Sequence, residues 1–150
     1  MKYRNKIIFL CFIVIIGLLI YNNRQAINEG FENNLNILGT PMQACSKAPE
    51  KTTGYYRNGY CSTGPTDTGT HVVCAVVDDD FLQFTRSKGN DLTSPQASFP
   101  GLVSGDKWCL CALRWKEAYE DGKAPKLIPE STNAIAKQYM SKDVLMKHST

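Results

Sequence analysis

The stretch HVVCAVVD, residues 71–78, decides the fold of this chain. It is an almost continuous run of β-branched and other apolar residues, which is typical of a strand buried on both faces. The next residues, DDFLQFTRSKGND at 79–91, continue a run of three carboxylates that suits a helix N-terminus, and Gly89 follows the last turn. We therefore expect a buried strand that leads directly into a helix.

A second buried strand is expected at residues 107–113, within the motif GDKWCLCALRW at 105–115. Alternation along a strand places Cys109 and Cys111 on one face and Trp108 on the other. Turn residues and apolar spacing predict further short strands at 36–38, 55–57 and 126–128, and helices near 115–119, 131–139 and 141–145. Together these elements indicate one compact α+β domain, with a small mixed β-sheet flanked by about four short helices.

The beginning of the chain carries an uninterrupted apolar run at residues 7–20, preceded by Lys2, Arg4 and Lys6. This run of 14 residues is shorter than the roughly 20 that a spanning helix needs. However, no small-residue cleavage site follows the run, and Lys6 can extend the span by reaching to the interface. We expect a retained signal-anchor, a single-pass transmembrane helix at residues 7–21.

The basic flank at residues 1–6 predicts a cytoplasmic N-terminus and a domain on the opposite side of the membrane. Residues 22–34 are polar and rich in Asn, which predicts a flexible tether, and residues 35–150 form the expected soluble domain. The Ile- and Asn-rich N-terminal region fits an A+T-rich genome, so a viral or virion membrane is one location that we consider.

The charge of the chain excludes one class of partner. Residues 33–150 hold 13 basic and 12 acidic groups, so the domain has almost no net charge. Such a domain has no field that gathers phosphates, and we expect no nucleic-acid partner. The partners that remain are the membrane, through the N-terminal helix, and a ligand whose identity the sequence does not give.

The cysteines of the domain admit several interpretations. Five of them are an odd number, so one would stay free if the others pair. Cys45 and Cys61 are the best pair by location, because both lie in expected loops. Cys109 and Cys111 could together bind a metal ion, although no Cys-x-x-Cys motif supports one. His71 and Cys74 would point to opposite faces of a straight strand and could not chelate together.

A catalytic interpretation uses a nucleophile, a base and an orienting group. Cys61 lies in a turn rich in Gly and Thr, where an exposed thiol can ionise. His71 at the start of the strand is the candidate base, with Asp67 or Asp91 to orient it. The alternative is structural, because Cys is among the most buried residue types and the strand cysteines are expected in the core.

A small polar pocket is expected where the Gly-rich loops meet the two buried strands. Its candidate lining residues are Cys61, His71, Asn90, Asp91 and Asp106. Arg57 and Asp67 are further candidates for contact with a ligand. No cofactor can be named from these residue types.

Several motifs in this order resemble one known family. They are NILGTPMQACS at 36–46, TGYYRNGYCSTGPTDTGTHVVCAVV at 53–77, FLQFTRSKGNDLTSP at 81–95, FPGLVSGDKWCLCALRWKEA at 99–118 and GKAP at 122–125. Over roughly residues 36–148 the chain is similar to the domain-of-unknown-function family 2237, small and usually unanchored proteins. The resemblance supports the domain limits but implies no substrate. Because cytosolic members would keep their thiols reduced, it also implies that disulfide stapling is not the general purpose of the cysteines.

The chain departs from the family pattern at three positions. Asn58 stands where Asp is usual, Tyr60 stands where a second Cys is frequent, and Asn133 stands where the family usually has His. A role that depends on that His would be lost here.

The sequence thus leaves three functions open. The first is an uncharacterised membrane-anchored domain that binds a small ligand or serves as an accessory. The second is a thiol-dependent enzyme that uses Cys61 and His71. The third is a metal-binding domain that uses Cys109 and Cys111.

Overall fold

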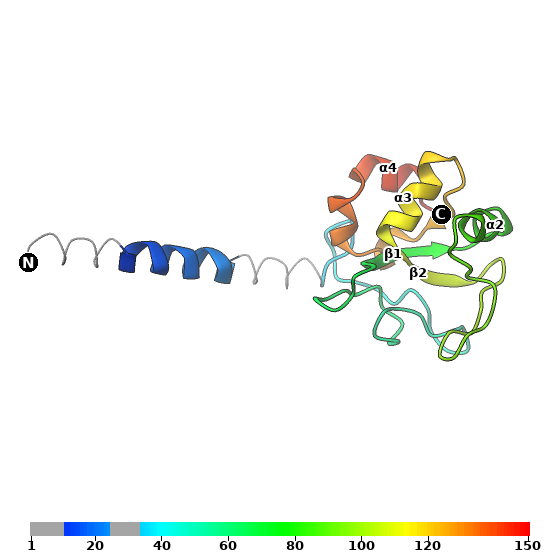
Figure 1. The fold of residues 1–150 in the computed structure, drawn as a ribbon. Helices are drawn as coiled ribbons and strands as arrows, with labels where there is room; N and C mark the ends of the chain where they lie inside the picture. The colour runs from blue at the N-terminus through cyan, green and yellow to red at the C-terminus, as the bar shows by residue number, and fades with distance from the viewer. Residues whose placement is uncertain (1–10, 25–33) are drawn as a thin grey trace, which may run out of the picture. The chain divides into compact units, whose positions relative to one another are not determined.

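The computed structural model describes residues 11–24 and 34–150, which fall into two separate units (Figure 1). In the first unit, residues 11–24 are helical and their side chains are exposed. Among the described residues, no helix has both the length and the apolar character needed to span a bilayer. The predicted anchor at 7–21 lies in part outside the described residues, as do the basic flank at 1–6 and residues 25–33 of the predicted tether.

The second unit is built on a three-stranded sheet. Its strands are β1 (His71–Val76), β2 (Lys107–Cys111) and β3 (Lys126–Leu127), in the spatial order β2-β1-β3. The four middle residues of β1 are buried, as the apolar run predicts for a central strand. The predicted α+β class is confirmed, but the prediction of a mixed sheet is wrong, because both strand pairings are antiparallel.

Helix α2 (Asp79–Ser87) begins and ends where the sequence predicts. The side chain of Asp78 accepts a hydrogen bond from the backbone N–H of Phe81 at 2.8 Å and so caps the first turn. At the other end, Gly89 has a φ of +80°, the left-handed conformation that glycine adopts without steric cost after a helix. Helix α3 (Ala112–Glu120) starts directly at the end of β2, and α4 (Lys142–Lys147) is capped by the side chain of Ser141.

Three predicted elements differ from the structure. The helix expected at 131–139 is replaced by two 3-10 helices, η1 (Pro129–Ser131) and η2 (Ala134–Gln138). Residues 36–38 do not form a strand: Asn36 makes an isolated bridge and residues 37–38 form a turn, which the side chain of Asn36 closes by accepting hydrogen bonds from the backbone of Leu38 and Thr40. Residues 55–57 form a turn as well, with Arg57 at a φ of +52°.

The apolar side chains of the domain form two clusters. The larger one contains Trp115, which is fully buried and donates its indole N–H to the carbonyl of Pro125 at 3.1 Å. In Figure 1, α3 and α4 lie above β1 and β2, while the loops that precede β1 run below them. The smaller cluster consists of four cysteines, Cys45, Cys61, Cys74 and Cys109, with Met42 and Ile128 packed against them.

Candidate functional site

A β-bulge at the start of β1 sets the direction of His71. Along the β1–β2 pair, Cys74 lies opposite Cys109, but His71 lies opposite Cys111, and the register shifts between His71 and Val73. The shift inserts one extra residue in β1, so His71 and Cys74 share a face although they are three residues apart. The expectation that these two side chains point to opposite faces assumed a straight strand, and the register shift removes that assumption.

His71 is held by a buried carboxylate. Its Nδ1 lies 2.6 Å from Oδ1 of Asp67, and its backbone N–H donates to Oδ2 of Asp67 at 2.8 Å. The hydroxyl of Thr63 also donates to Oδ2, at 2.9 Å. The Asp67 side chain has no exposed area, whereas 38% of the His71 side chain is exposed.

The hydrogen bonds around Asp67 decide the tautomer of His71. Burial alone would raise the pKa of Asp67, but the hydrogen bonds from His71 and Thr63 outweigh it and lower the pKa below its ordinary value. Asp67 is therefore ionised at neutral pH and can only accept, so Nδ1 of His71 carries the proton. When the ring is neutral, Nε2 keeps its lone pair, and it has no hydrogen-bond partner among the described residues.

Two neighbours fix the imidazole ring in this place. Tyr55 stacks on it, with ring centroids 6.1 Å apart and an angle of 16° between the planes. The Tyr55 hydroxyl donates to the carbonyl of Thr66 at 2.9 Å, which ties this ring to the turn before β1. A Cβ at Gly69 would collide with the His71 ring, so the ring can keep this position only beside a glycine.

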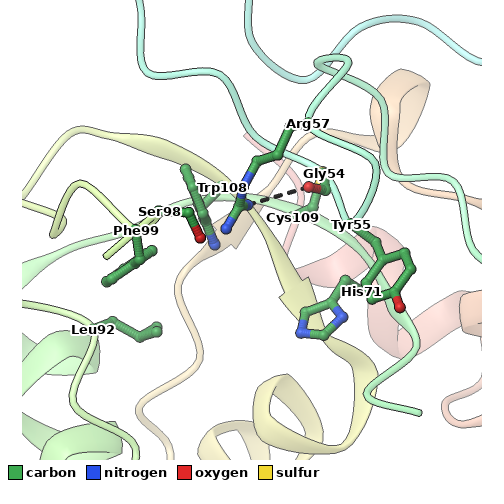
Figure 2. Close-up of a pocket in the computed structure, with 9 residues that line it drawn as sticks. All are labelled: Gly54, Tyr55, Arg57, His71, Leu92, Ser98, Phe99, Trp108 and Cys109. Carbon is green, nitrogen blue, oxygen red and sulfur yellow. Dashed lines mark hydrogen bonds between the residues drawn. The ribbon is translucent and has the colours of Figure 1, made fainter. Parts of the chain in front are cut away.

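The exposed edge of His71 faces an open cleft of about 400 Å³, which Figure 2 shows. Tyr55 and His71 form one wall, and Arg57, Phe99 and Trp108 stand across from them. The cleft is also lined by Gly54, Leu92, Ser98 and Cys109. We call this space, together with the adjoining depression described next, the His71 cleft.

The adjoining depression of about 200 Å³ extends the cleft toward the start of α3. It shares His71 with the larger part and adds Cys111, Asn90 and Arg114. The lining residues of the two parts include two arginines, Arg57 and Arg114, and no aspartate or glutamate. The lining is thus aromatic and basic.

Strained backbone gathers around the cleft. Three described residues other than glycine have a positive φ: Arg57 at +52°, Thr70 at +48° and Ala97 at +24°. Arg57 lines the cleft, Thr70 immediately precedes His71, and Ala97 immediately precedes the lining residue Ser98. Such conformations cost on the order of 1–3 kcal/mol each and cluster at functional sites, which makes this cleft the best candidate in the described part of the chain.

Arg57 presents its guanidinium to the cleft. The group lies 4.9 Å from the centre of the Trp108 ring, and Nη1 donates to the carbonyl of Gly54 at 3.2 Å. A cation–π contact and one hydrogen bond leave other N–H groups of the guanidinium for a ligand. The predicted ligand-binding role of Arg57 stays a prediction, but its position in the cleft suits it.

The structure pairs four cysteines differently from the sequence-based expectation. The disulfides are Cys45–Cys74 and Cys61–Cys109, so the predicted Cys45–Cys61 pair is wrong. The expectation failed because it paired loop with loop, whereas each bond joins a loop to one of two adjacent strands.

Cys61 is fully buried and bonded, so in this oxidised form it offers no thiol to a ligand. Its predicted catalytic role stays a prediction that requires the bond to open. Cys111 is the free thiol of the domain, half-buried in the adjoining depression. From the sequence, Cys111 had two interpretations, packing in the core and metal binding together with Cys109, although the odd number of cysteines was a signal that one would remain unpaired.

The other predicted pocket residues, Asn90, Asp91 and Asp106, differ in their contacts. Asn90 lines the cleft and donates to the hydroxyl of Thr85 at 2.8 Å. Asp91 accepts hydrogen bonds from Thr93 and Ser94. These bonds lower the pKa of Asp91, and the bond from the Thr93 hydroxyl has the largest effect. In the structure it is Asp67 that contacts His71, while Asp91 closes its own loop.

Asp106 likewise stands outside the cleft lining. Its carboxylate accepts from Nζ of Lys51 at 2.5 Å and from the backbone N–H of Val103 at 2.8 Å. Residue Asn133 departs from the family pattern, and here it caps η2 by accepting from the backbone N–H of Ile135 at 3.0 Å. This contact gives Asn133 a structural role at the start of η2.

Comparison with known proteins gives a family but no activity. No curated protein sequence matches the chain. The family model DUF2237, described as an uncharacterized protein conserved in bacteria, matches residues 35–149, which is nearly the whole second unit. The chain therefore belongs to the DUF2237 family.

Proposed function

We propose that the domain binds a small molecule in the His71 cleft and acts on it through the thiol of Cys111. His71 serves as the base, and Asp67 orients it. The observation that carries this proposal is the pairing of His71 with Cys111 across the strands, with Nδ1 of His71 already bonded to a buried carboxylate. A nucleophile, a base and a group that orients the base are the parts that thiol catalysis needs.

The geometry favours proton transfer between Cys111 and His71. Side chains directly opposite each other in an antiparallel pair have Cβ atoms about 4.5–5.5 Å apart. Both residues line the same depression, and we propose that the sulfur comes within reach of Nε2, directly or through one water. Cys111 is also the N-cap residue of α3, where helix N–H groups stabilise negative charge.

The step itself is a nucleophilic attack. Nε2 of His71 takes the thiol proton, and Asp67 stabilises the imidazolium that results. The thiolate of Cys111 then forms a bond to an electrophilic carbon of the ligand, and the leaving group takes the proton back from His71. This use of Cys111 replaces Cys61 in the thiol-enzyme hypothesis, because Cys61 is bonded to Cys109.

The lining of the cleft indicates the class of ligand. Aromatic faces of Tyr55, Phe99 and Trp108 suit a flat apolar body, and the guanidinium of Arg57 suits an anionic group. No lining carboxylate opposes such an anion. We propose an electrophilic small molecule that carries an aromatic or conjugated part and a negative charge.

Alkylation of the free thiols tests this proposal. The full-length oxidised protein, purified in a mild detergent, is treated with iodoacetamide at pH 7, and the modification of each cysteine is followed by mass spectrometry. In His71→Ala, alkylation of Cys111 should slow by at least roughly tenfold, somewhat below the usual contribution of a general base. Cys11, the other free thiol, serves as an internal control whose rate should not change. If Cys111 is alkylated at the same rate in the wild type and in His71→Ala, His71 does not activate this thiol, and the proposed thiol chemistry is refuted.

We also propose that residues 7–21 anchor the domain to a membrane and hold it on the non-cytoplasmic side. The two disulfides support this placement, because such bonds persist mainly in oxidising compartments. Alkaline carbonate extraction tests the anchor, since an anchored protein stays with the membrane pellet. Protease added to intact cells or vesicles tests the side. Release into the supernatant by carbonate would refute the anchor.

A further inference from the structure

The second candidate site is the buried cluster of cysteines on the face of β1 and β2 that also carries Cys111. Cys45, Cys61, Cys74 and Cys109 are each at most 2% exposed. They come from four separate segments of the chain, two loops and two neighbouring strands. The sulfur atoms of Cys45, Cys61 and Cys109 all lie within 4.8 Å of one another, although Cys45 belongs to a different disulfide from the other two.

This arrangement is close to a tetrahedral thiolate site. Zinc–sulfur bonds are about 2.3 Å long, so the four sulfurs of a zinc tetrathiolate lie about 3.8 Å apart. The sulfur of Cys45 lies within 4.8 Å of the sulfurs of Cys61 and Cys109, and the sulfur of Cys74, which is bonded to that of Cys45, would have to move closer to complete the four. After reduction, the sulfurs of each pair need only separate by side-chain rotation to surround one ion.

The backbone holds the four cysteines in place without the disulfides. Cys74 and Cys109 lie opposite each other in the β1–β2 pair. The backbone N–H of Cys109 donates to the hydroxyl of Thr53 at 2.8 Å, and that of Cys74 donates to the hydroxyl of Thr132 at 3.2 Å. The backbone N–H of Cys45 donates to the carbonyl of Gly59 at 2.8 Å, which keeps its loop beside the loop of Cys61.

We propose that these four cysteines form a zinc site when both disulfides are reduced. Two molecules of a dithiol reductant supply four electrons and four protons, and each becomes a cyclic disulfide while the protein gains four thiols. The thiols then release four protons as their sulfurs bind Zn²⁺, which gives a tetrathiolate centre of charge −2. The domain thus has two cross-linked forms, one closed by disulfides and one closed by a metal ion.

The surroundings favour zinc over a catalytic metal. Four protein ligands leave no open position, which is the mark of a structural zinc site, and soft thiolates prefer such an ion. Met42 and Ile128 pack against the cluster and keep water out. The site does not use Cys111, so it differs from the predicted metal pair of Cys109 and Cys111 and is independent of the proposed thiol chemistry.

Cobalt binding tests the zinc site. The full-length protein in mild detergent is reduced with dithiothreitol, freed of the reductant under argon and titrated with Co²⁺. One Co²⁺ per chain should bind with the intense visible bands of tetrahedral cobalt thiolate, and Zn²⁺ should remove these bands. The variants Cys111→Ser, Cys11→Ser and His71→Ala should keep the spectrum, whereas Cys61→Ser should lose it.

A second measurement covers the case in which Cys61→Ser fails to fold. The reduced wild-type protein is alkylated briefly with and without Zn²⁺, and each cysteine is analysed by mass spectrometry. Zinc should protect the four cluster cysteines, while Cys111 reacts in both samples. Absence of stoichiometric cobalt binding, loss of the spectrum in Cys111→Ser, or alkylation of the cluster that zinc does not slow would each overturn the proposal.

Discussion

His71 lies directly opposite Cys111 across β1 and β2, and one inserted residue in β1 puts it there. Without that residue the imidazole would point toward the apolar core that Val73 and Leu110 help to form. With it, the imidazole shares a face with the free thiol and leaves one edge exposed to a cleft. The proposed chemistry depends on this local irregularity more than on any other element of the fold.

Gly69→Ala should move the His71 ring and spare the rest of the domain. The added Cβ would collide with the ring, which is the movable partner because 38% of its side chain is exposed. We expect Cys111 alkylation to slow nearly as much as in His71→Ala, while the melting temperature falls by a few degrees at most. The measurement combines thiol mass spectrometry with thermal unfolding. An unchanged Cys111 rate would show that the ring position does not matter.

Asp67→Asn should weaken both the fold and the orientation of His71. An amide offers one acceptor where the carboxylate accepts from the His71 ring, the His71 backbone and Thr63. We expect a loss of about 1–3 kcal/mol in the free energy of unfolding at pH 7, the cost of an unsatisfied buried partner. Urea denaturation measures the difference, and Asp121→Asn on the surface is a suitable control.

The same variant should change how stability depends on pH. Because folding lowers the pKa of Asp67, its contribution is present above its unfolded pKa and is lost as the pH falls through the folded value. The gap between wild type and Asp67→Asn should therefore be widest from pH 5 to 7 and narrow steadily below about pH 4. A gap that is constant down to pH 2 would mean that Asp67 is not held ionised by these contacts.

The two disulfides should each stabilise the oxidised domain. The pairs are 29 and 48 residues apart, and loop-closure entropy assigns about 3.6 and 4.1 kcal/mol to such loops at 25 °C. We expect the double variant Cys61→Ala/Cys109→Ala to lose at least as much stability as Cys45→Ala/Cys74→Ala. Urea unfolding of the oxidised proteins measures both losses. Loss of less than 1 kcal/mol in either pair would show that the bond does not form or adds nothing to the oxidised state.

Arg57 should select anionic reagents. In the wild type we expect the ratio of the iodoacetate rate to the iodoacetamide rate to be higher for Cys111 than for free cysteine in the same buffer. Arg57→Gly should remove this preference and leave stability unchanged or slightly higher, because glycine tolerates the positive φ at this position. Lys137→Ala in η2, outside the cleft lining, is the control and should keep the preference. The same ratio in wild type and Arg57→Gly would exclude an anion-binding role for Arg57.

The sequence could predict those elements whose signals are local. The β-branched run of β1, the carboxylate of Asp78 and the conformation of Gly89 specify a strand, a helix start and a helix end through contacts within a few residues. The 3-10 helices were harder to predict from the sequence. Their limits are set by the cap at Asn133 and by tertiary contacts of its neighbours, and not by helical periodicity. The candidate site could be predicted from the sequence only in part: His71 was an expected residue, and Asp67 was one of two expected partners for it.

The bulge and the cysteine pairing could not be predicted, because both depend on which residues face each other across strands. A shift of one residue in the β1–β2 register changes the face of the sheet toward which the His71 side chain points. No residue near His71 gives a sequence signal for this shift. The same register brings Cys74 and Cys109 side by side and lets each accept a different loop cysteine. The free thiol of Cys111 is what remains once those pairings are made.

A crystal structure of the oxidised protein at neutral pH would give the distance between Nε2 of His71 and the sulfur of Cys111, on which the proposed thiol chemistry depends. We expect these two atoms to lie within about 4 Å or to be bridged by a single water, with Nδ1 hydrogen-bonded to Asp67. A ring turned to the opposite face of β1, or a Cys111 sulfur bonded to another cysteine, would contradict it.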